Sequence, residues 1–303
     1  MAMFMDAMCY EECRGPHAGS AAYHGLVALY PGLRMPQALR TLHSWETLVP
    51  GEEGLPVAAE LLMCMADRLR SGGDTKRREA ADIIELSFDG YLREMDWEQL
   101  RGADVQDAGP TRSGEAGVVS DAVAIMLGMQ SRGEASKTGH NQGLLIDFPG
   151  VRQMLRRRKA AVEPNEHLFS LRQPEYRRLW KEIVMEMGVE GLVGKPHSVR
   201  HTGPSRDVFL GYRGLREIQR RGRWRADASV LRYAKTHYYV RCMAQTPRDL
   251  IERGAELLEA LGARAVPPLG WRRLHRRPAL PPRQPIWDPD VATAGAAVAA
   301  RGS

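Results

Sequence analysis

The chain has 303 residues, a length that suits one large domain or two smaller ones and allows a sizeable hydrophobic core. Its 43 Lys and Arg residues exceed its 37 Asp and Glu residues, and the formal charge of +6 favours a polyanionic partner. The sequence has no run of about eighteen apolar residues and no signal-peptide pattern, so we expect a soluble, unsecreted protein without a membrane partner.

The four cysteines do not form the pattern of a disulfide framework or of a zinc site. Cys9 and Cys13 make a single C-x-x-x-C pair, and neither Cys64 nor Cys242 supplies a second pair. We therefore expect a reducing compartment.

The first 55 residues mix short helical pieces with turn signals at Arg14-Gly15-Pro16 and Tyr30-Pro31-Gly32, and contain no long amphipathic run. Trp45 is expected to pack at a domain joint. This stretch predicts a region of short helices at residues 1–55.

Two helices are predicted next. Apolar residues recur at helical spacing between Pro56 and Gly72, and Asp74 is placed to cap the following helix. That helix keeps one apolar face as far as Tyr91, so Arg93 should follow a buried helix end.

A hairpin is expected after these helices. Residues 106–117 read as a loop, Val118–Leu127 as a strand and Gly143–Phe148 as a second β-like run. Ser136-Lys137-Thr138-Gly139 lies between the two runs, which places Lys137 on the hairpin connection.

The second half returns to helical periodicity and then loses it. Helices are predicted at Pro174–Met187, from Ser198 or Thr202 onward, at Leu215–Gly222, and after Thr246-Pro247 as an N-cap with proline in the first turn. Beyond Gly262, sequence rich in Pro and Arg predicts a basic disordered tail over residues 263–303.

The stretch from Lys195 to Lys235 concentrates the candidate chemistry. It contains a His-x-x-Arg pair, His197 and Arg200, and then Gly-Arg-Trp, with Tyr233 nine residues beyond Trp224. Together with Arg93 and Lys137 upstream, this order resembles the catalytic end of the tyrosine recombinases, also called the phage integrase family. The resemblance covers roughly residues 30–240, and several matches in order are more specific than any single motif.

The resemblance implies an α/β fold of the α+β kind, mostly helical with a small antiparallel sheet. Residues 56–262 would be the catalytic domain, and residues 1–55 part of a helical DNA-clamping domain. Members of this family cleave DNA when a tyrosine attacks a phosphate. The implied site consists of Arg93, Lys137, His197, Arg200, Trp224 and the nucleophile Tyr233.

These residue types suit transesterification at a phosphate. A phenol can form a phosphotyrosine that conserves the energy of the cleaved bond, and guanidinium groups match phosphate oxygens bidentately. Lys137 could protonate the leaving hydroxyl, and His197 could accept a proton or contact the phosphate. Trp224 can donate one N–H but cannot transfer a proton. Neither a cofactor nor a metal is expected, because the side chains supply the positive charge.

A metal site remains an alternative for the histidines. His197 and His201 are four residues apart and face together on a helix, as zinc ligands can. A third ligand is missing nearby, although Asp207 and His237 are possible. The rival nucleophiles, Tyr238 and Tyr239, miss the nine-residue spacing from Trp224.

The expected partner is double-stranded DNA, with self-association on the DNA and no small-molecule substrate. Residues expected to contact phosphates are Arg156, Arg157, Arg158, Lys159, Arg220, Arg221, Arg223 and Arg225. The motif variants look like those of divergent eukaryotic mobile elements, which would place the protein in the nucleus, or otherwise in the cytoplasm.

Two other functions stay open, a catalytically silent DNA-binding remnant and a type IB-like topoisomerase. The short N-terminal region is smaller than the family's usual DNA clamp. We therefore expect a truncated product that attaches to DNA weakly, without sequence preference and in a salt-dependent way.

Overall fold

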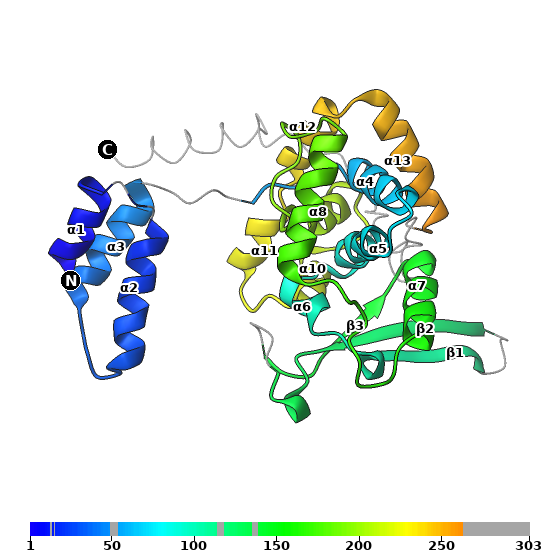
Figure 1. Cartoon of the computed structure of the whole chain (residues 1–303), viewed down its shortest axis with the longest axis horizontal. Helices are drawn as coiled ribbons and strands as arrows, with labels where there is room; N and C mark the ends of the chain where they lie inside the picture. Colours follow the sequence, from blue (N-terminus) through cyan, green and yellow to red (C-terminus); the bar gives the residue numbers. More distant parts are fainter. Residues whose placement is uncertain (13, 15, 49–53, 114–117, 135–138, 263–303) are drawn as a thin grey trace, which may run out of the picture. The chain divides into compact units, whose positions relative to one another are not determined.

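The computed structural model describes residues 1–12, 14, 16–48, 54–113, 118–134 and 139–262, and only the backbone at 109–113 and 118–120. Most of these residues are helical, and three strands form one antiparallel sheet (Figure 1), so the α+β class predicted from the sequence is confirmed. Within the described ranges no helix is both long and apolar enough to cross a membrane. The predicted tail, residues 263–303, lies outside them.

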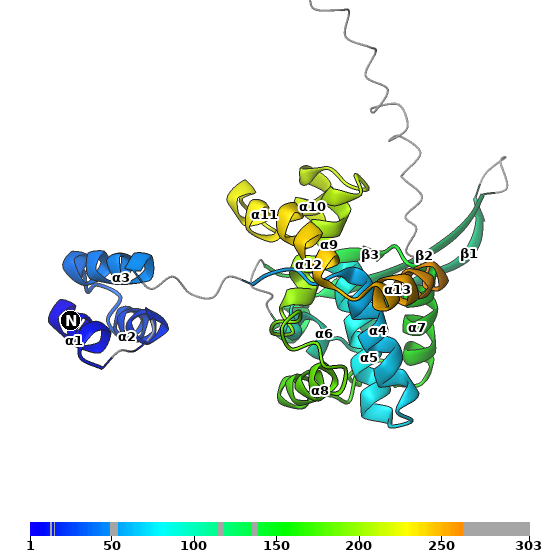
Figure 2. The same ribbon diagram turned by 90° about the horizontal axis from the view of Figure 1, so that it is seen from above.

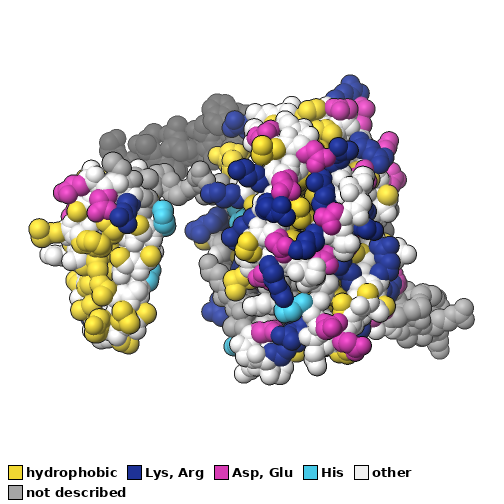
Figure 3. All heavy atoms as spheres, viewed as in Figure 1, with side chains coloured by type: hydrophobic (Ala, Val, Ile, Leu, Met, Phe, Trp, Pro, Cys, Tyr) yellow, Lys and Arg dark blue, Asp and Glu magenta, His cyan; other side chains and the backbone are white. Residues whose placement is uncertain are grey.

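The N-terminal region forms three helices with a core of their own. They are α1 (Ala2–Tyr10), α2 (Pro16–Leu29) and α3 (Pro36–Leu48). Trp45 was expected at a domain joint, but it packs inside this core, with Leu42 and against Gly19. The outside is also apolar: Figure 3 shows a broad hydrophobic face, and Met3 and Leu29 are among the exposed side chains.

The larger body is organised around two buried helices, α4 (Ala59–Ser71) and α5 (Thr75–Gly90). Asp74 caps α5 as predicted, because its carboxylate accepts a hydrogen bond of 3.1 Å from Lys76 N. The remaining helices are α6 (Glu94–Glu98), α7 (Pro149–Ala160), α8 (Gln173–Glu186), α9 (Ser198–Phe209), α10 (Leu215–Gly222), α11 (Asp227–Tyr233), α12 (Thr236–Gln245) and α13 (Arg248–Ala260). Figures 1 and 2 show these helices grouped around α4 and α5.

The sheet has the order β1-β2-β3, formed by β1 (Val105–Ser113), β2 (Val118–Leu127) and β3 (Gln142–Ile146). Alternate residues such as Val123, Ile125 and Ile146 are buried, as a one-sided sheet requires. The prediction of a loop at residues 106–117 is wrong, because most of that segment pairs with β2 as an edge strand. A register shift between Asp107 and Pro110 accommodates the proline, which edge strands and bulges tolerate.

The last described helix packs directly onto the first helix of the larger body (Figure 2). A Cβ atom on Gly254 of α13 would lie 2.1 Å from the carbonyl oxygen of Glu60 in α4, so only glycine permits this approach. The Cys64 thiol donates a hydrogen bond of 3.3 Å to the Leu250 carbonyl at the same contact. The predicted Thr246 cap is not formed, since α13 begins at Arg248 after Pro247 and the Thr246 hydroxyl donates to Cys242 O.

We expect Gly254→Ala to lower the free energy of unfolding by about 1–3 kcal/mol, because the two helix backbones must separate to admit the methyl group. Chemical denaturation followed by circular dichroism would measure the change. Gly191→Ala is the control, since a Cβ there meets nothing within 4 Å. Equal stability of the two variants would contradict the close-packing interpretation.

Candidate active site

The His-x-x-Arg pair lies at the start of α9. His197 is the N-cap residue and Arg200 lies in the first turn, with no exposed side-chain surface. The Arg200 guanidinium donates to the carbonyl of Tyr91, and its Nη2 donates to the carbonyl of Gly222 at 2.7 Å. These carbonyls lie at the C-terminal ends of α5 and α10, where unpaired C=O groups and the helix dipole stabilise a cation.

Tyr91 connects α5 to the candidate site. It is the C-cap of α5 in the left-handed conformation (φ 49°), and its ring stacks on Trp224 with centroids 6.3 Å apart. Its hydroxyl donates to Asp207, and burial beside that carboxylate raises the pKa of Tyr91, so the phenol stays protonated. Gly203 of α9 permits the contact, because a Cβ there would lie 2.5 Å from the Tyr91 ring.

A single carboxylate, Asp96, lies among three arginines. Asp96 Oδ2 accepts from the backbone N–H of Arg93 at 2.9 Å and from Nη2 of Arg223 at 2.6 Å. It also lies 3.7 Å from Nη1 of Arg200. Burial, together with the charges of Arg93 and Arg223, lowers the pKa of Arg200 to about 9. The guanidinium therefore remains charged at neutral pH, but in surroundings that disfavour its charge.

The predicted nucleophile lies beside the predicted histidine and tryptophan. Tyr233, the last residue of α11, has its hydroxyl oxygen 3.4 Å from Nε2 of His197. Its ring stacks on Trp224 at 4.6 Å and on His201 at 4.4 Å, and the Arg200 guanidinium lies 5.4 Å from its centroid. Residues from the start of α9, from the turn after α10 and from the end of α11 thus meet at one place.

The two rival tyrosines lie elsewhere. Tyr239 is buried in the main core with its hydroxyl 3.5 Å from a Glu60 oxygen, and burial raises its pKa. Tyr238 lines a cavity of about 580 Å³ with Pro56 and Cys242. His197 also lines this cavity, so the cavity adjoins the predicted site at this residue.

Several buried N–H groups at this place lack an acceptor, which is uncommon in protein interiors. Among the residues that the structure describes, no hydrogen-bond partner exists for Nη1 of Arg93, Nε of Arg200, Nε and Nη1 of Arg223, or Nε1 of Trp224. All of these atoms are donors, and all except the indole nitrogen belong to guanidinium groups. The arrangement therefore suits an oxyanion with several acceptor atoms.

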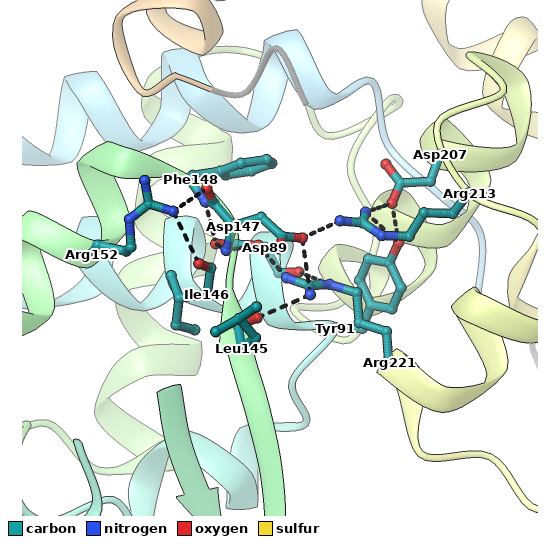
Figure 4. A network of polar contacts seen from close by, with 10 residues as sticks. All are labelled: Asp89, Tyr91, Leu145, Ile146, Asp147, Phe148, Arg152, Asp207, Arg213 and Arg221. Carbon is teal, nitrogen blue, oxygen red and sulfur yellow. Dashed lines mark hydrogen bonds and ion pairs between the residues drawn. The ribbon is translucent and has the colours of Figure 1, made fainter. Parts of the chain in front are cut away.

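A second polar network fixes α10 and with it the turn that carries Trp224 (Figure 4). Arg221 donates to the carbonyl of Asp89 at 2.8 Å and to that of Leu145 at 3.0 Å. Arg213 pairs with both Asp147 and Asp207, and Arg152 of α7 donates to the carbonyl of Asp147 at 2.8 Å, so the network joins α5, β3, α7 and α9. Tyr91 reaches it through Asp207. The network and the candidate site therefore share Tyr91.

Lys137, the remaining predicted catalytic residue, lies outside the described residues. Its neighbourhood agrees with the expected hairpin: β2 and β3 pair antiparallel, from Leu127 with Gln142 to Val123 with Ile146, and residues 128–141 connect them.

The metal alternative gains no third ligand from the structure. The rings of His197 and His201 have centroids 5.3 Å apart, while Asp207 is engaged by Tyr91 and Arg213. No group of three His, Cys, Asp or Glu residues able to hold a metal ion occurs in the described part of the chain.

The basic residues predicted to contact DNA separate into two sets. The exposed side chains are those of Arg157, Lys159, Arg220 and Arg225. The others are held by acidic residues of this chain: Arg156 by Asp107 and Asp121, Arg158 by Glu79 and Asp82, Arg221 by Asp89 and Asp147, and Arg223 by Asp96. Figure 3 shows Lys and Arg side chains interspersed with Asp and Glu on the visible face of the larger body.

Sequence reasoning missed three members of the site. Tyr91 was expected only on the apolar face of a helix, and Asp96 was not among the predicted site residues. Arg223 was expected on the surface, but its side chain is 5% exposed. The signal that could have found Asp96 is its place three residues after Arg93, one helical turn away. Nothing comparable marks Arg223 as buried.

His201 gives a prediction for stability against pH. Burial and the neighbouring His197, Lys235 and Arg200 charges lower its pKa to about 3, from 6.5 for an ordinary histidine. Unfolding then takes up a proton between these values, so the free energy of unfolding should fall as pH drops below 6.5, by up to about 1.4 kcal/mol per pH unit. In His201→Gln this acid-side slope should be smaller, as measured by urea denaturation between about pH 4.5 and 6.5.

The control is His140→Gln, which changes an exposed histidine of the same body and should keep the slope of the unchanged protein. If His201→Gln keeps that slope as well, His201 does not account for the acid-side loss of stability.

No protein-family profile matches the chain, and no curated protein matches its sequence. The integrase of the transposon Tn1549, solved in complex with transposon right-end DNA, matches 85% of this chain and 84% of its own, with a TM-score of 0.50 and 14% identity.

Two further matches are weaker. The XerH recombinase bound to its difH substrate has a TM-score of 0.46 at 15% identity, covering 80% of this chain and 75% of its own. The integrase of mycobacterium phage Brujita has a TM-score of 0.39 at 16% identity, covering 78% and 75%. Identities this low bear on the fold alone, and the similarity to the Tn1549 integrase carries the conclusion: the chain has a tyrosine recombinase-family fold.

Proposed function

We propose that the protein cleaves and rejoins DNA through a 3′-phosphotyrosine intermediate, as a site-specific recombinase or integrase of a mobile element. The observation that carries this proposal is the position of Tyr233, whose hydroxyl lies 3.4 Å from His197 beside the buried Arg200. A phenol next to a proton acceptor and to buried guanidinium N–H groups that lack partners in the described structure has the parts that phosphoryl transfer needs.

The cleavage step that we propose uses these residues together with Lys137, the general acid predicted from the sequence. The phenol oxygen of Tyr233 attacks the phosphorus, and its proton passes to Nε2 of His197. The bond from phosphorus to the 5′-oxygen breaks, and that oxygen takes a proton from Lys137. Rejoining reverses each transfer, so no nucleotide cofactor is consumed.

The buried donors act on the charge that grows in the transition state. Arg93 and Arg200 offer N–H groups to the non-bridging oxygens, and the indole N–H of Trp224 can donate to the same group. These donors are already fixed, Arg200 by two helix-end carbonyls and Trp224 by its stacked neighbours. Little reorganisation is then needed when the phosphate becomes more negative.

The similar transposon integrase was solved with DNA, which supports double-stranded DNA as the partner here. The exposed Arg157, Lys159, Arg220 and Arg225 are the residues we propose for phosphate contacts outside the site. Arg156 and Arg158 could join them only by leaving their carboxylate partners. Self-association on DNA belongs to the same proposal.

Tyr233→Phe should lower covalent adduct formation by at least about 1,000-fold, because the substitution removes the attacking oxygen. The measurement is denaturant-resistant attachment to a pool of nicked duplexes of randomised sequence, so that the target site need not be identified first. Tyr238→Phe is the control and should form adduct normally. An adduct that persists in Tyr233→Phe but is lost in Tyr238→Phe would reassign the nucleophile.

The same assay separates the alternatives. No adduct from the unchanged protein on any member of the pool would favour a catalytically silent DNA-binding remnant. An adduct combined with relaxation of a supercoiled plasmid, and without strand exchange between two duplexes, would favour a topoisomerase.

Lys137→Ala should slow cleavage of ordinary DNA by about 100- to 10,000-fold, the usual contribution of a general acid. The defect should largely disappear on DNA with sulfur in place of the bridging 5′-oxygen, since a thiolate leaves without protonation. Tyr233→Phe is the control and should be inactive on both substrates. An undiminished defect of Lys137→Ala on the sulfur substrate would assign Lys137 another role.

A further inference from the structure

Arg223 has a backbone conformation that costs energy. It is the C-cap of α10 in the left-handed region (φ 57°, ψ 38°), where glycine is the usual residue because a side chain is strained there. Gly222, one residue earlier, cannot be exchanged with it, since a Cβ at Gly222 would lie 2.1 Å from the Trp224 ring. The chain therefore has an arginine where glycine would give the more stable turn.

The side chain adds a second cost. It is 5% exposed, and only Nη2 has a partner in the described structure, the carboxylate of Asp96 at 2.6 Å. Nε and Nη1 are buried without an acceptor. Burying unpaired donors of a charged group is unfavourable, so neither the backbone nor the side chain of Arg223 is explained by stability alone.

The groups around Arg223 indicate which kind of ligand would pair with its buried donors. Arg200 and Arg223 both lie within 3.7 Å of the same oxygen of Asp96, and Arg93 donates its backbone N–H to that oxygen. Two guanidinium groups and one backbone N–H thus share one carboxylate oxygen. Burial lowers the pKa of Arg223, and Asp96 only partly opposes this effect. An anion with several acceptor atoms would satisfy both the charge and the unpaired donors.

We infer that Arg223 is a third catalytic arginine, whose Nε and Nη1 groups donate to the non-bridging oxygens of the phosphate that Tyr233 attacks. The Asp96 carboxylate accepts a hydrogen bond from Nη2 of Arg223 and so orients the Nε and Nη1 groups of the same guanidinium. The inference rests on the proposed function and goes beyond it, because it moves Arg223 from the surface role expected from the sequence to the reacting group.

Arg223→Gly is the informative substitution, because glycine relieves the left-handed strain while it removes the guanidinium. We expect the midpoint of thermal unfolding to stay the same or rise, and the rate of adduct formation to fall by about 100- to 1,000-fold, as when one transition-state donor is lost. Arg216→Ala is the control: it removes an exposed arginine from the same helix and should change neither quantity.

A second substrate distinguishes phosphate contact from structural support. On DNA with a neutral methylphosphonate at the cleaved position, less negative charge develops, so the defect of Arg223→Gly should shrink to less than about 10-fold. A rate equal to that of the unchanged protein on ordinary DNA would overturn the inference while leaving the proposed function intact. A defect of equal size on both substrates would overturn it as well.

Failure of the proposed function has a different signature, since the unchanged protein would then form no adduct. In that case inorganic phosphate is the probe, with binding followed by the NMR signal of the Trp224 indole N–H. The inference predicts that phosphate shifts this signal and that Arg223→Gly weakens the apparent affinity at least about 10-fold. An unshifted signal, or equal affinity in the variant, would overturn it.

Discussion

The buried guanidinium of Arg200 is the interaction on which the arrangement of this site depends. Its hydrogen bonds go to the carbonyls of Tyr91 and Gly222, at the ends of α5 and α10. A fully buried cation needs such partners, because unpaired burial would cost several kcal/mol. The two helices must therefore end close together, and their caps, Tyr91 and Arg223, both turn into the left-handed conformation. The burial of Arg200 therefore determines where Trp224, Arg223 and the turn at Arg93 lie.

The same cation also explains why the site is electrostatically unbalanced. The carbonyls stabilise Arg200 but carry no net charge, and Asp96 is shared with Arg93 and Arg223. A second carboxylate at this point would balance the charge and compete with an incoming phosphate. The acids that could do so, Asp89, Asp147 and Asp207, are instead occupied by Arg213 and Arg221 in the adjoining network. Tyr91 contacts both the adjoining network, whose charges are paired, and the candidate site, which keeps an excess of positive charge.

The sequence predicted those structural features that local residue patterns determine. Helical spacing of apolar residues identified α4, α5 and α8, and the resemblance to the tyrosine recombinases identified residues between His197 and Tyr233 that the structure brings together. It could not reveal β1, because a strand that contains Gly109 and Pro110 exists only through pairing with β2. Nor could it reveal that Arg223 is buried, since that depends on how α10 ends. Features set by tertiary partners leave no periodic signal in the chain.

The packing of α13 on α4 has a consequence for the order of folding. The thiol of Cys64 and the carbonyl of Leu250 are 186 residues apart, yet they meet where α13 packs on α4. A ribosome releases α4 long before α13 exists, so an apolar face of α4 stays uncovered during most of synthesis. Contacts between such distant segments form slowly, and uncovered apolar faces attract chaperones or aggregate. The core of this body can close only once α13 has been synthesised.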